Sequence, residues 1–220
     1  MKNVFAFLEN IKDNNNRPWF EENKVEYQNA LETFKILVTD VEQKLSKTDV
    51  LEKSKVFRIY RDVRFSKDKL PYKNNMAAYF ERASKMRRGG YYIHIQPGGD
   101  TFVGGGFWQP EPDDLKRIRD EFAYDHQTIS KILEDPQFIK YFGGISTEDA
   151  LKNPPRGYDK ELSGIQLIKQ KSFVASRKFT DKEVLSPTFS DEVVKTFATL
   201  RPFFDYMSAI LTTNINGEPL

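Results

Sequence analysis

Apolar residues near the N-terminus recur every three or four positions, which is the spacing of an amphipathic helix. This spacing predicts one helix over residues 4–11 and, after three consecutive asparagines, a second helix that runs toward Lys47. Asn16 is in position to cap the second helix, because its side chain can accept a bond from a free backbone N–H group. Pro18 suits the first turn of the same helix.

The C-terminal part of the chain has the same helical spacing. Thr180 and Glu183 stand three residues apart, as in a capping box, and a last helix is predicted to begin near Ser190. Pro202 lies inside the apolar stripe of that last helix and should kink or split it, because proline lacks the N–H group that a helix interior needs.

The middle of the chain changes to the two-residue period of β-strands. Residues 56–65 alternate between apolar and polar, and the runs 91–96 and 101–108 flank a Pro-Gly-Gly-Asp turn that is typical of a hairpin. Residues 171–179 predict a further strand. The order of elements predicts an α+β fold, a single domain over residues 1–220 in which long N-terminal and C-terminal helices pack on a mainly antiparallel sheet.

The register of the predicted hairpin decides which residues share a face of the sheet. If Gln96 pairs with Thr101, His94 lies on the same face as Val103, and Phe102 lies on the opposite face. A slip of one residue would reverse the assignment of the second strand. The sequence leaves both registers open.

Composition excludes several classes of site. The chain of 220 residues has no cysteine, which removes disulfides, thiolate metal sites and cysteine nucleophiles and favours a cytoplasmic location. Only two histidines are present and no acidic motif for Mg²⁺ or Ca²⁺ appears, so no metal ligand is predicted. No window approaches the ~20 apolar residues of a membrane span, so we expect no membrane partner.

The net charge of +2 conceals a strongly basic segment. Residues 53–88 hold twelve Lys and Arg against three acidic residues, a net charge of +9, which leaves −7 for the rest of the chain. Such a segment can steer anionic ligands toward the protein. The alternative is that acidic helices fold over the basic strand and the charges pair internally, and composition leaves both readings open.

The basic strand and the turn that follows it form the main candidate for a binding site. The planar guanidinium group of arginine matches the oxygens of carboxylate and phosphate groups. Asp62 would orient an arginine or act as a base; in the alternative reading it belongs to an Arg–Asp lattice that joins helix to sheet. The candidate charge contacts are Arg58, Arg61, Arg64, Lys67, Lys69 and Lys73.

The hairpin offers three further candidates. Gly104 and Gly105 would form a backbone floor under a ligand, or would leave room for an aromatic side chain packed over bare backbone. Trp108 would stack on a planar ligand or belong to the core. His94 would act as a general acid or base together with Asp62 if there is chemistry, or would be an ordinary hydrogen-bonded strand residue.

A loop after the hairpin holds one more candidate. Arg156 stands between prolines and a glycine, in a stiff loop that would present its charge to a ligand or have no role. The glycines do not form a phosphate loop, because Gly105 stands where that motif requires lysine.

Several blocks of the chain are similar to the signature blocks of a widespread family. The blocks are FRIYRDVRFSKDKLPYK, GGYYIHIQPGG and TFVGGGFWQPEPDDLKRIR, followed by LKNPPRGYD and KQKSF. The family is classed as a domain of unknown function, number two-four-six-one. The resemblance covers nearly the whole chain and implies a single α+β domain in which the basic strand and the glycine hairpin belong together. Where the family pattern leads us to expect a histidine-proline pair, the chain has Lys160–Ser163.

The sequence supports three hypotheses about function and names no reaction or cofactor. The first is a domain that binds a phosphorylated or carboxylated small molecule at the basic strand and the glycine-rich hairpin. The second is a nucleic-acid-binding module, because basic residues alternate with aromatic ones. The third is a non-catalytic protein-interaction domain whose long helices offer the partner surface. The oligomeric state is not predicted.

Overall fold

The computed structural model describes residues 1–84, 86–214 and 218–219. In this part of the chain, helices precede and follow the first four strands of one antiparallel sheet, which confirms the α+β class. The elements are α1 Lys2–Asp13, α2 Arg17–Glu22, α3 Lys24–Leu45, β1 Leu51–Val56, β2 Met76–Arg82, β3 Gly90–Ile95, β4 Thr101–Phe107, α4 Pro112–Tyr124, α5 Gln127–Leu133, α6 Pro136–Phe142, α7 Ile165–Ile168, β5 Phe173–Phe179, α8 Asp181–Val184, α9 Phe189–Thr199 and α10 Arg201–Thr212.

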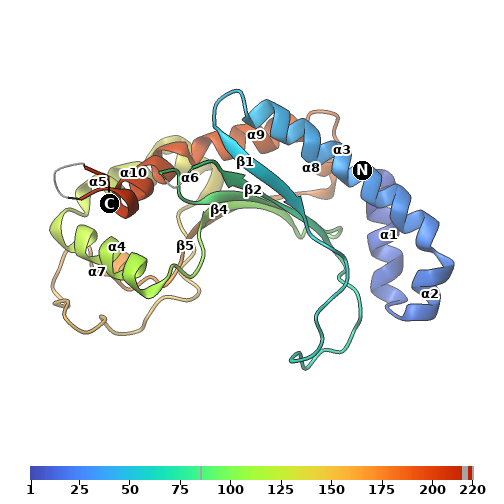
Figure 1. Ribbon diagram of the computed structural model, residues 1–220, viewed down its shortest axis with the longest axis horizontal. Coiled ribbons are helices and arrows are strands. Elements are labelled where there is room, and N and C mark those ends of the chain that lie inside the picture. The colour runs from blue at the N-terminus through green and yellow to red at the C-terminus, as the bar shows by residue number, and fades with distance from the viewer. Residues whose placement is uncertain (85, 215–217, 220) are drawn as a thin grey trace. The chain divides into compact units, whose positions relative to one another are not determined.

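The five strands lie side by side in the order in which they occur along the chain (Figure 1). The described chain divides into two compact units, and strands of the sheet contribute to both. Unit 1 consists of residues 1–80, 92–103 and 178–195, and unit 2 consists of residues 81–91, 104–177 and 196–220.

Local capping chemistry sets several helix ends as the sequence predicts. The side chain of Asn16 accepts a bond from the Trp19 N–H group at 3.0 Å, and α2 begins there with Pro18 in its first turn. Thr180 and Glu183 form a complete capping box at the start of α8. Pro202 separates α9 from α10, so the predicted last helix is indeed split.

The core of unit 1 is rich in aromatic side chains. Helix α1 packs along α3, and α3 also contacts β1. Phe20 is fully buried and stacks on Tyr72, with ring centroids 4.1 Å apart. Phe7 and Tyr27 lie beside this pair, with centroids 5.5 Å apart, so the N-terminal helices and residue 72 share one apolar cluster.

The core of unit 2 forms where α10 and the end of α9 cover the sheet. The ring of Tyr91 is fully buried and lies 4.9 Å from the ring of Phe197 and 5.0 Å from that of Phe204. Phe107 meets Phe203 edge to face at 5.8 Å. These contacts hold one face of the sheet against helices.

The predicted basic strand over residues 56–65 is wrong in its bounds. The regular strand β1 ends at Val56, and only an isolated bridge between Tyr60 and Tyr72 continues the pairing. Alternation alone does not make a strand, because a strand needs a partner along its length and a face to bury. Phe65, expected on the buried face, is 95 % exposed.

Of the two hairpin registers that the sequence leaves open, the structure has the one shifted by one residue from the Gln96–Thr101 pairing. The rings of His94 and Phe102 stack at 4.7 Å, so these two residues share a face. The fully buried Val103 therefore lies on the other face, with Ile93 and Ile95. The hydroxyl of Thr101 explains the shift, because it accepts from the N–H group of Gln96 at 3.1 Å and donates to its carbonyl at 2.9 Å. This side chain takes the place of a backbone partner at the turn.

No helix in the described ranges is long and apolar enough to cross a bilayer.

Candidate functional site

The segment between β1 and β2, residues 57–75, forms a long loop that leaves the sheet in unit 1 (Figure 1). We call it the basic loop. Its two arms are joined near the sheet by backbone bonds, from Lys73 N to Ile59 O at 2.8 Å and from Arg61 N to Pro71 O at 2.9 Å. The loop therefore has an anchored base and a tip that extends beyond these bonds.

Three of the six predicted cations have partners inside the loop. Arg61 forms an ion pair with Asp68. Arg64 donates to both carboxylate oxygens of Asp62, at 2.9 and 2.6 Å. Lys69 donates to the carbonyl of Val63 at 2.9 Å. These side chains are paired internally, but within the loop itself, so they do not form the Arg–Asp lattice between helix and sheet that the alternative reading described.

Arg58, Lys67 and Lys73 behave differently, because none of them forms an ion pair with any residue that the structure describes. Arg58 is exposed and Lys73 is half-buried. Burial lowers the pKa of Lys73, and the neighbouring charges of Arg58 and Arg61 lower it further. Arg58 and Lys73 thus form a pair of like charges at the base of the loop that no described residue holds in an ion pair, although Asp62 is close enough for the charge of Arg58 to lower its pKa.

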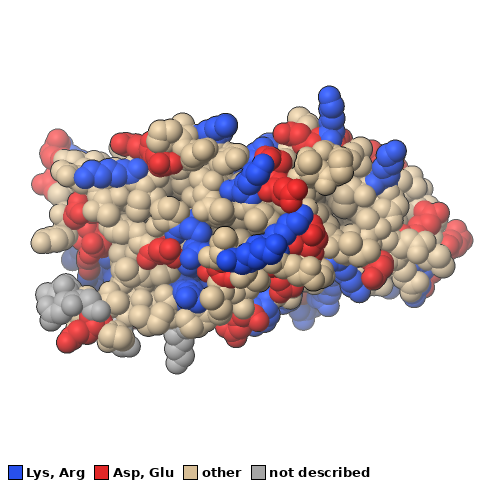
Figure 2. Space-filling view, turned by 90° about the horizontal axis from the view of Figure 1, so that it is seen from above, with Lys and Arg blue, Asp and Glu red and all other residues tan. Residues whose placement is uncertain are grey.

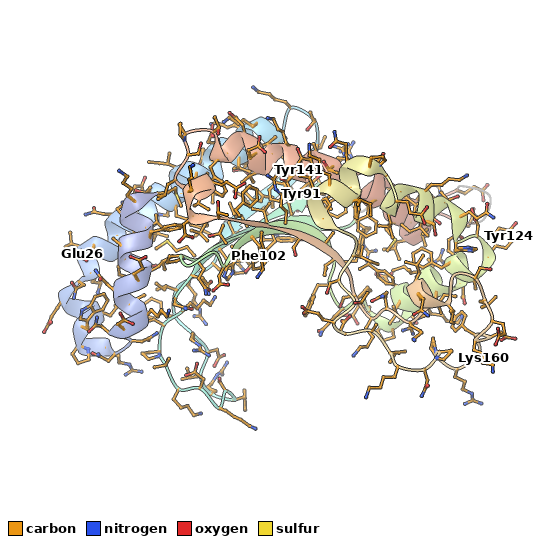
Figure 3. The ribbon with its side chains drawn as sticks, turned by 180° about the vertical axis from the view of Figure 1, so that it is seen from behind. Glu26, Tyr91, Phe102, Tyr124, Tyr141 and Lys160 are labelled. Atoms are coloured by element: carbon orange, nitrogen blue, oxygen red, sulfur yellow. The ribbon has the colours of Figure 1, made fainter. Side chains whose placement is uncertain are left out.

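Four rings lie beside these cations on the face of the sheet that the helices leave uncovered. Phe57 and Tyr92 have centroids 6.1 Å apart, and Tyr92 lies 5.8 Å from Phe102. Phe102 in turn stacks on His94, with an angle of 16° between the ring planes. Figure 3 shows Phe102 on this uncovered face. We call Phe57, Tyr92, His94 and Phe102 the aromatic row.

Lys73, one of the unpaired cations, is in contact with the aromatic row. The Lys73 ammonium lies 5.7 Å from the centroid of Phe57, within the range of a cation–π interaction. Lys55, on β1, lies over the same ring at 5.6 Å. The site therefore combines positive charge with flat apolar surface, as the sequence predicts for Lys73, while Lys55 and the full row are additions from the structure.

His94 is half-buried at one end of the row. Its Nε2 atom lies 3.1 Å from Oε1 of Gln96, and Gln96 donates to Asp100 at 3.2 Å. Burial lowers the pKa of His94 below its ordinary value of 6.5, although Gln96 and Asp100 act in the opposite direction. The imidazole is therefore neutral at pH 7 and can exchange hydrogen bonds with a ligand.

Asp62, the proposed chemical partner of His94, is engaged elsewhere. The hydrogen bonds from the side chain and backbone of Arg64 lower the pKa of the Asp62 carboxyl, which makes it a weak base. No contact among the described residues links Asp62 with His94. The geometry gives the pair no shared site of proton transfer.

The two candidate glycines lie in unit 2, where packing explains both. A Cβ atom on Gly104 would lie 2.2 Å from the carbonyl oxygen of Ala175 on the neighbouring strand. A Cβ atom on Gly105 would lie 2.8 Å from the Phe204 ring. These positions need glycine because backbone and an aromatic ring approach them closely, which matches the alternative reading of the cluster.

Trp108 and Arg156 also lie in unit 2, and both are exposed. The residue after Trp108, Gln109, has a φ of +45° and donates its N–H group to Ser172 at 3.1 Å. The Ser172 hydroxyl donates to Asp149 at 2.7 Å. This network fixes the turn that presents Trp108, and nothing in the sequence pattern pointed to Ser172 or Asp149.

Charge on the rest of the surface is mixed. On the face shown in Figure 2, basic and acidic side chains are interspersed, so that face has no broad field of one sign. The residues that the structure describes contain no group of three or more His, Cys, Asp or Glu that could hold a metal ion.

The family assignment comes from comparison with known proteins. A family model described as "Conserved hypothetical protein (DUF2461)" matches residues 3–206, nearly the whole chain. The chain belongs to this family. No curated protein and no solved structure matches it. Membership of DUF2461 confirms the resemblance seen in the sequence.

Proposed function

We propose that this DUF2461 protein binds an anionic small molecule that carries a planar ring and a phosphate or carboxylate group. The ligand would lie in unit 1, with its anionic group at Arg58 and Lys73 and its ring against the aromatic row. The observation that carries the proposal is that Arg58 and Lys73, two neighbouring cations at the base of the loop, form no ion pair with any residue that the structure describes.

Electrostatics supports an anion at this position. Two like charges near each other raise the free energy of the folded protein, and partial burial of Lys73 weakens the screening by water. A bound phosphate or carboxylate would offset this repulsion and accept charge-assisted hydrogen bonds from the guanidinium and ammonium groups. The planar guanidinium group of Arg58 would donate two parallel hydrogen bonds to the anion, and the ammonium group of Lys73 would act as a compact point charge.

The aromatic row supports a planar ring rather than a bare anion. The rings of Phe102 and His94 stack with nearly parallel planes on the uncovered face of the sheet, where the ring of a ligand would pack against them. Neutral His94 adds a hydrogen-bonding group at one end. The close approach of backbone and of the Phe204 ring explains why positions 104 and 105 are glycine, so the proposed ligand contacts lie in unit 1 alone.

Isothermal titration with three related probes tests the two parts of the site separately. AMP carries both ring and phosphate, ribose 5-phosphate lacks the base, and adenosine lacks the phosphate. We expect AMP to bind most tightly, and both Arg58→Ala and Lys73→Met to weaken it about tenfold or more. Lys12→Met, an exposed lysine on α1, is the matched control and should change nothing. Equal binding by wild type and Lys73→Met would overturn the proposal.

A second candidate is single-stranded nucleic acid. The observation in its favour is that rings and cations follow one another along the row and the loop, since bases can stack on aromatic side chains while phosphates meet cations. Its signature is an affinity for oligonucleotides that falls steeply with salt. Binding of AMP without binding of a longer strand would favour the small molecule.

We further propose that the protein is cytoplasmic, because a chain without cysteine suits a reducing compartment.

A further inference from the structure

The tip of the basic loop, residues 62–70, exposes apolar side chains to water. Phe65 is 95 % exposed and Leu70 is 46 % exposed. Isolated exposed leucines are common, but a phenylalanine that is almost wholly free of protein contact leaves a large apolar surface in water. The tip is therefore the part of unit 1 where an apolar partner would gain most from contact.

Cations occur in the same stretch of the chain as these apolar side chains. The guanidinium of Arg64 lies 5.9 Å from the ring centroid of Phe65, and both Lys67 and Lys69 are exposed. The two acidic residues of the tip are already engaged, Asp62 by Arg64 and Asp68 by Arg61. The ion pairs offset the charges of Arg64 and Arg61 as well, so the tip presents two exposed apolar side chains together with two lysines, Lys67 and Lys69, that form no ion pair with a described residue.

The base of the loop is held firmly, so the tip projects from a fixed support. The side-chain amide of Asn15 bonds to both backbone polar groups of Tyr72, and Tyr72 is buried against Phe20. Backbone bonds join the two arms above this point. The two arms that carry the tip are therefore fixed within unit 1, which limits the backbone entropy lost when a partner binds there.

We propose that the loop tip attaches the protein reversibly to a membrane surface that contains anionic phospholipid. Phe65 would enter the boundary between headgroups and acyl chains, and Leu70 would rest beside it. Lys67 and Lys69 would remain among the anionic headgroups, as long basic side chains do at membrane interfaces. From the sequence we expected no membrane partner, because it contains no apolar window long enough to span a bilayer, and this proposal departs from that expectation. The described residues contain no helix that could span a bilayer, but attachment at the surface needs none.

The combination of side chains favours lipid over the other partners. A base stacks on an aromatic ring, but it gains little from the aliphatic Leu70, whereas acyl chains accept both side chains. A protein groove would bury the apolar residues but would have to pair or desolvate the cations nearby in the chain. One inserted ring with a few lysines gives weak binding, so the attachment is reversible.

This inference is independent of the proposed ligand site. The ligand site uses Arg58 and Lys73 at the base of the loop, and membrane attachment uses Phe65 and Lys67 at the tip. The two proposals can therefore fail separately. Lys73→Met should weaken AMP binding and leave membrane attachment nearly unchanged, while Phe65→Ala should do the reverse.

Co-sedimentation of the full chain with vesicles tests the inference. One set of vesicles contains phosphatidylcholine alone and the other also contains phosphatidylserine. We expect sedimentation only with phosphatidylserine, and less of it at high salt. Phe65→Ala should lower the partition coefficient about tenfold or more, and Lys67→Ala about fivefold. Phe65→Trp should preserve binding.

The variants are safe to interpret because Phe65 is almost fully exposed and its loss removes no core contact. Val25→Ala is the matched control, since Val25 is 67 % exposed on α3 in the same unit. Equal sedimentation of wild type and Phe65→Ala would overturn the inference, as would a wild type that fails to sediment. Binding of a single-stranded oligonucleotide that depends on Phe65, without vesicle binding, would overturn it in favour of nucleic acid.

Discussion

The side-chain amide of Asn15 forms two hydrogen bonds with the backbone of Tyr72, a residue that follows it by more than fifty positions. Its Nδ2 atom donates to the Tyr72 carbonyl at 3.0 Å, and the Tyr72 N–H group donates to Oδ1 at 3.0 Å. The amide thus satisfies both polar groups of a buried residue, as a neighbouring strand would do. It ties the returning arm of the basic loop to the turn between α1 and α2.

Replacement of Asn15 by alanine should therefore lower the free energy of unfolding. The change leaves two backbone groups of Tyr72 without partners in a partly buried position, which costs about 1–3 kcal/mol. Urea denaturation measures the change. Asn153→Ala, in an exposed loop, is the control and should stay within about 0.5 kcal/mol of wild type. An equal effect of the two changes would contradict the role given to Asn15.

Gly104→Ala distinguishes packing from ligand binding at the glycine cluster. The added Cβ atom would lie 2.2 Å from the carbonyl oxygen of Ala175, so one strand must move, at a cost of about 3 kcal/mol or more. Gly98→Ala is the control, because its φ of +89° brings strain of about 1–2 kcal/mol but its Cβ meets no atom within 4 Å. In thermal unfolding, the melting temperature of Gly104→Ala should be well below that of Gly98→Ala. If Gly104 were a ligand floor instead, its alanine variant would fold normally and lose only ligand affinity.

Local chemistry made part of the fold predictable from the sequence. The cap at Asn16, the capping box at Thr180 and the break at Pro202 depend on residues a few positions apart, and all three are present. The register of the hairpin is a different case. It depends on the hydroxyl of Thr101, which replaces a backbone partner of Gln96, and on burial against helices far along the chain. Alternation of residue types cannot report either effect.

The candidate site shows the same difference between features that nearby residues determine and features that only the folded chain determines. The sequence identified the cations of the basic loop but not their partners, although Asp62 and Asp68 lie close enough in the chain to suggest internal pairing with Arg64 and Arg61. The aromatic row was missed because it requires the correct register, which alone places Phe102 beside His94. Gly105 needs glycine because of Phe204, about one hundred positions later, a relationship that only the folded chain reveals.

Tyr158 predicts how stability responds to alkaline pH. Its hydroxyl donates to Asp120 at 2.7 Å, and burial together with that carboxylate raises the pKa of Tyr158 from 10.0 to about 12. The unfolded chain therefore releases this proton first. The stabilisation is complete below pH 10 and is lost as the pH rises through about 12.

Comparison of wild type with Tyr158→Phe isolates this effect from the titration of lysines. Wild type should lose stability between pH 10 and 12 more steeply than Tyr158→Phe, by less than about 1 kcal/mol because Asp120 is exposed and solvent screens the pair. Urea unfolding at several pH values measures both slopes. Parallel slopes for the two proteins would show that the Tyr158–Asp120 bond does not persist in solution.

The lowered pKa of His94, a residue of the proposed site, predicts that stability also depends on pH on the acidic side of neutrality. Burial lowers the pKa of His94 below 6.5, so the unfolded chain takes up this proton before the folded one. Stability is complete above pH 6.5 and falls as the pH drops through the lower pKa of the folded protein. The His94→Gln variant should lack this loss, because glutamine does not titrate.

Proton NMR titration of the His94 ring connects this prediction with ligand binding. The chain has two histidines, so the spectrum of a His126→Asn variant assigns the remaining resonance to His94. We expect a midpoint below 6.5 in the free protein and a higher midpoint with saturating AMP, since a phosphate near Lys73 offsets the positive charge that disfavours protonation of the imidazole. Lys73→Met should slightly raise the titration midpoint of His94 in the ligand-free protein, and AMP should no longer change that midpoint. A midpoint that AMP leaves unaltered in wild type would place the phosphate away from the aromatic row.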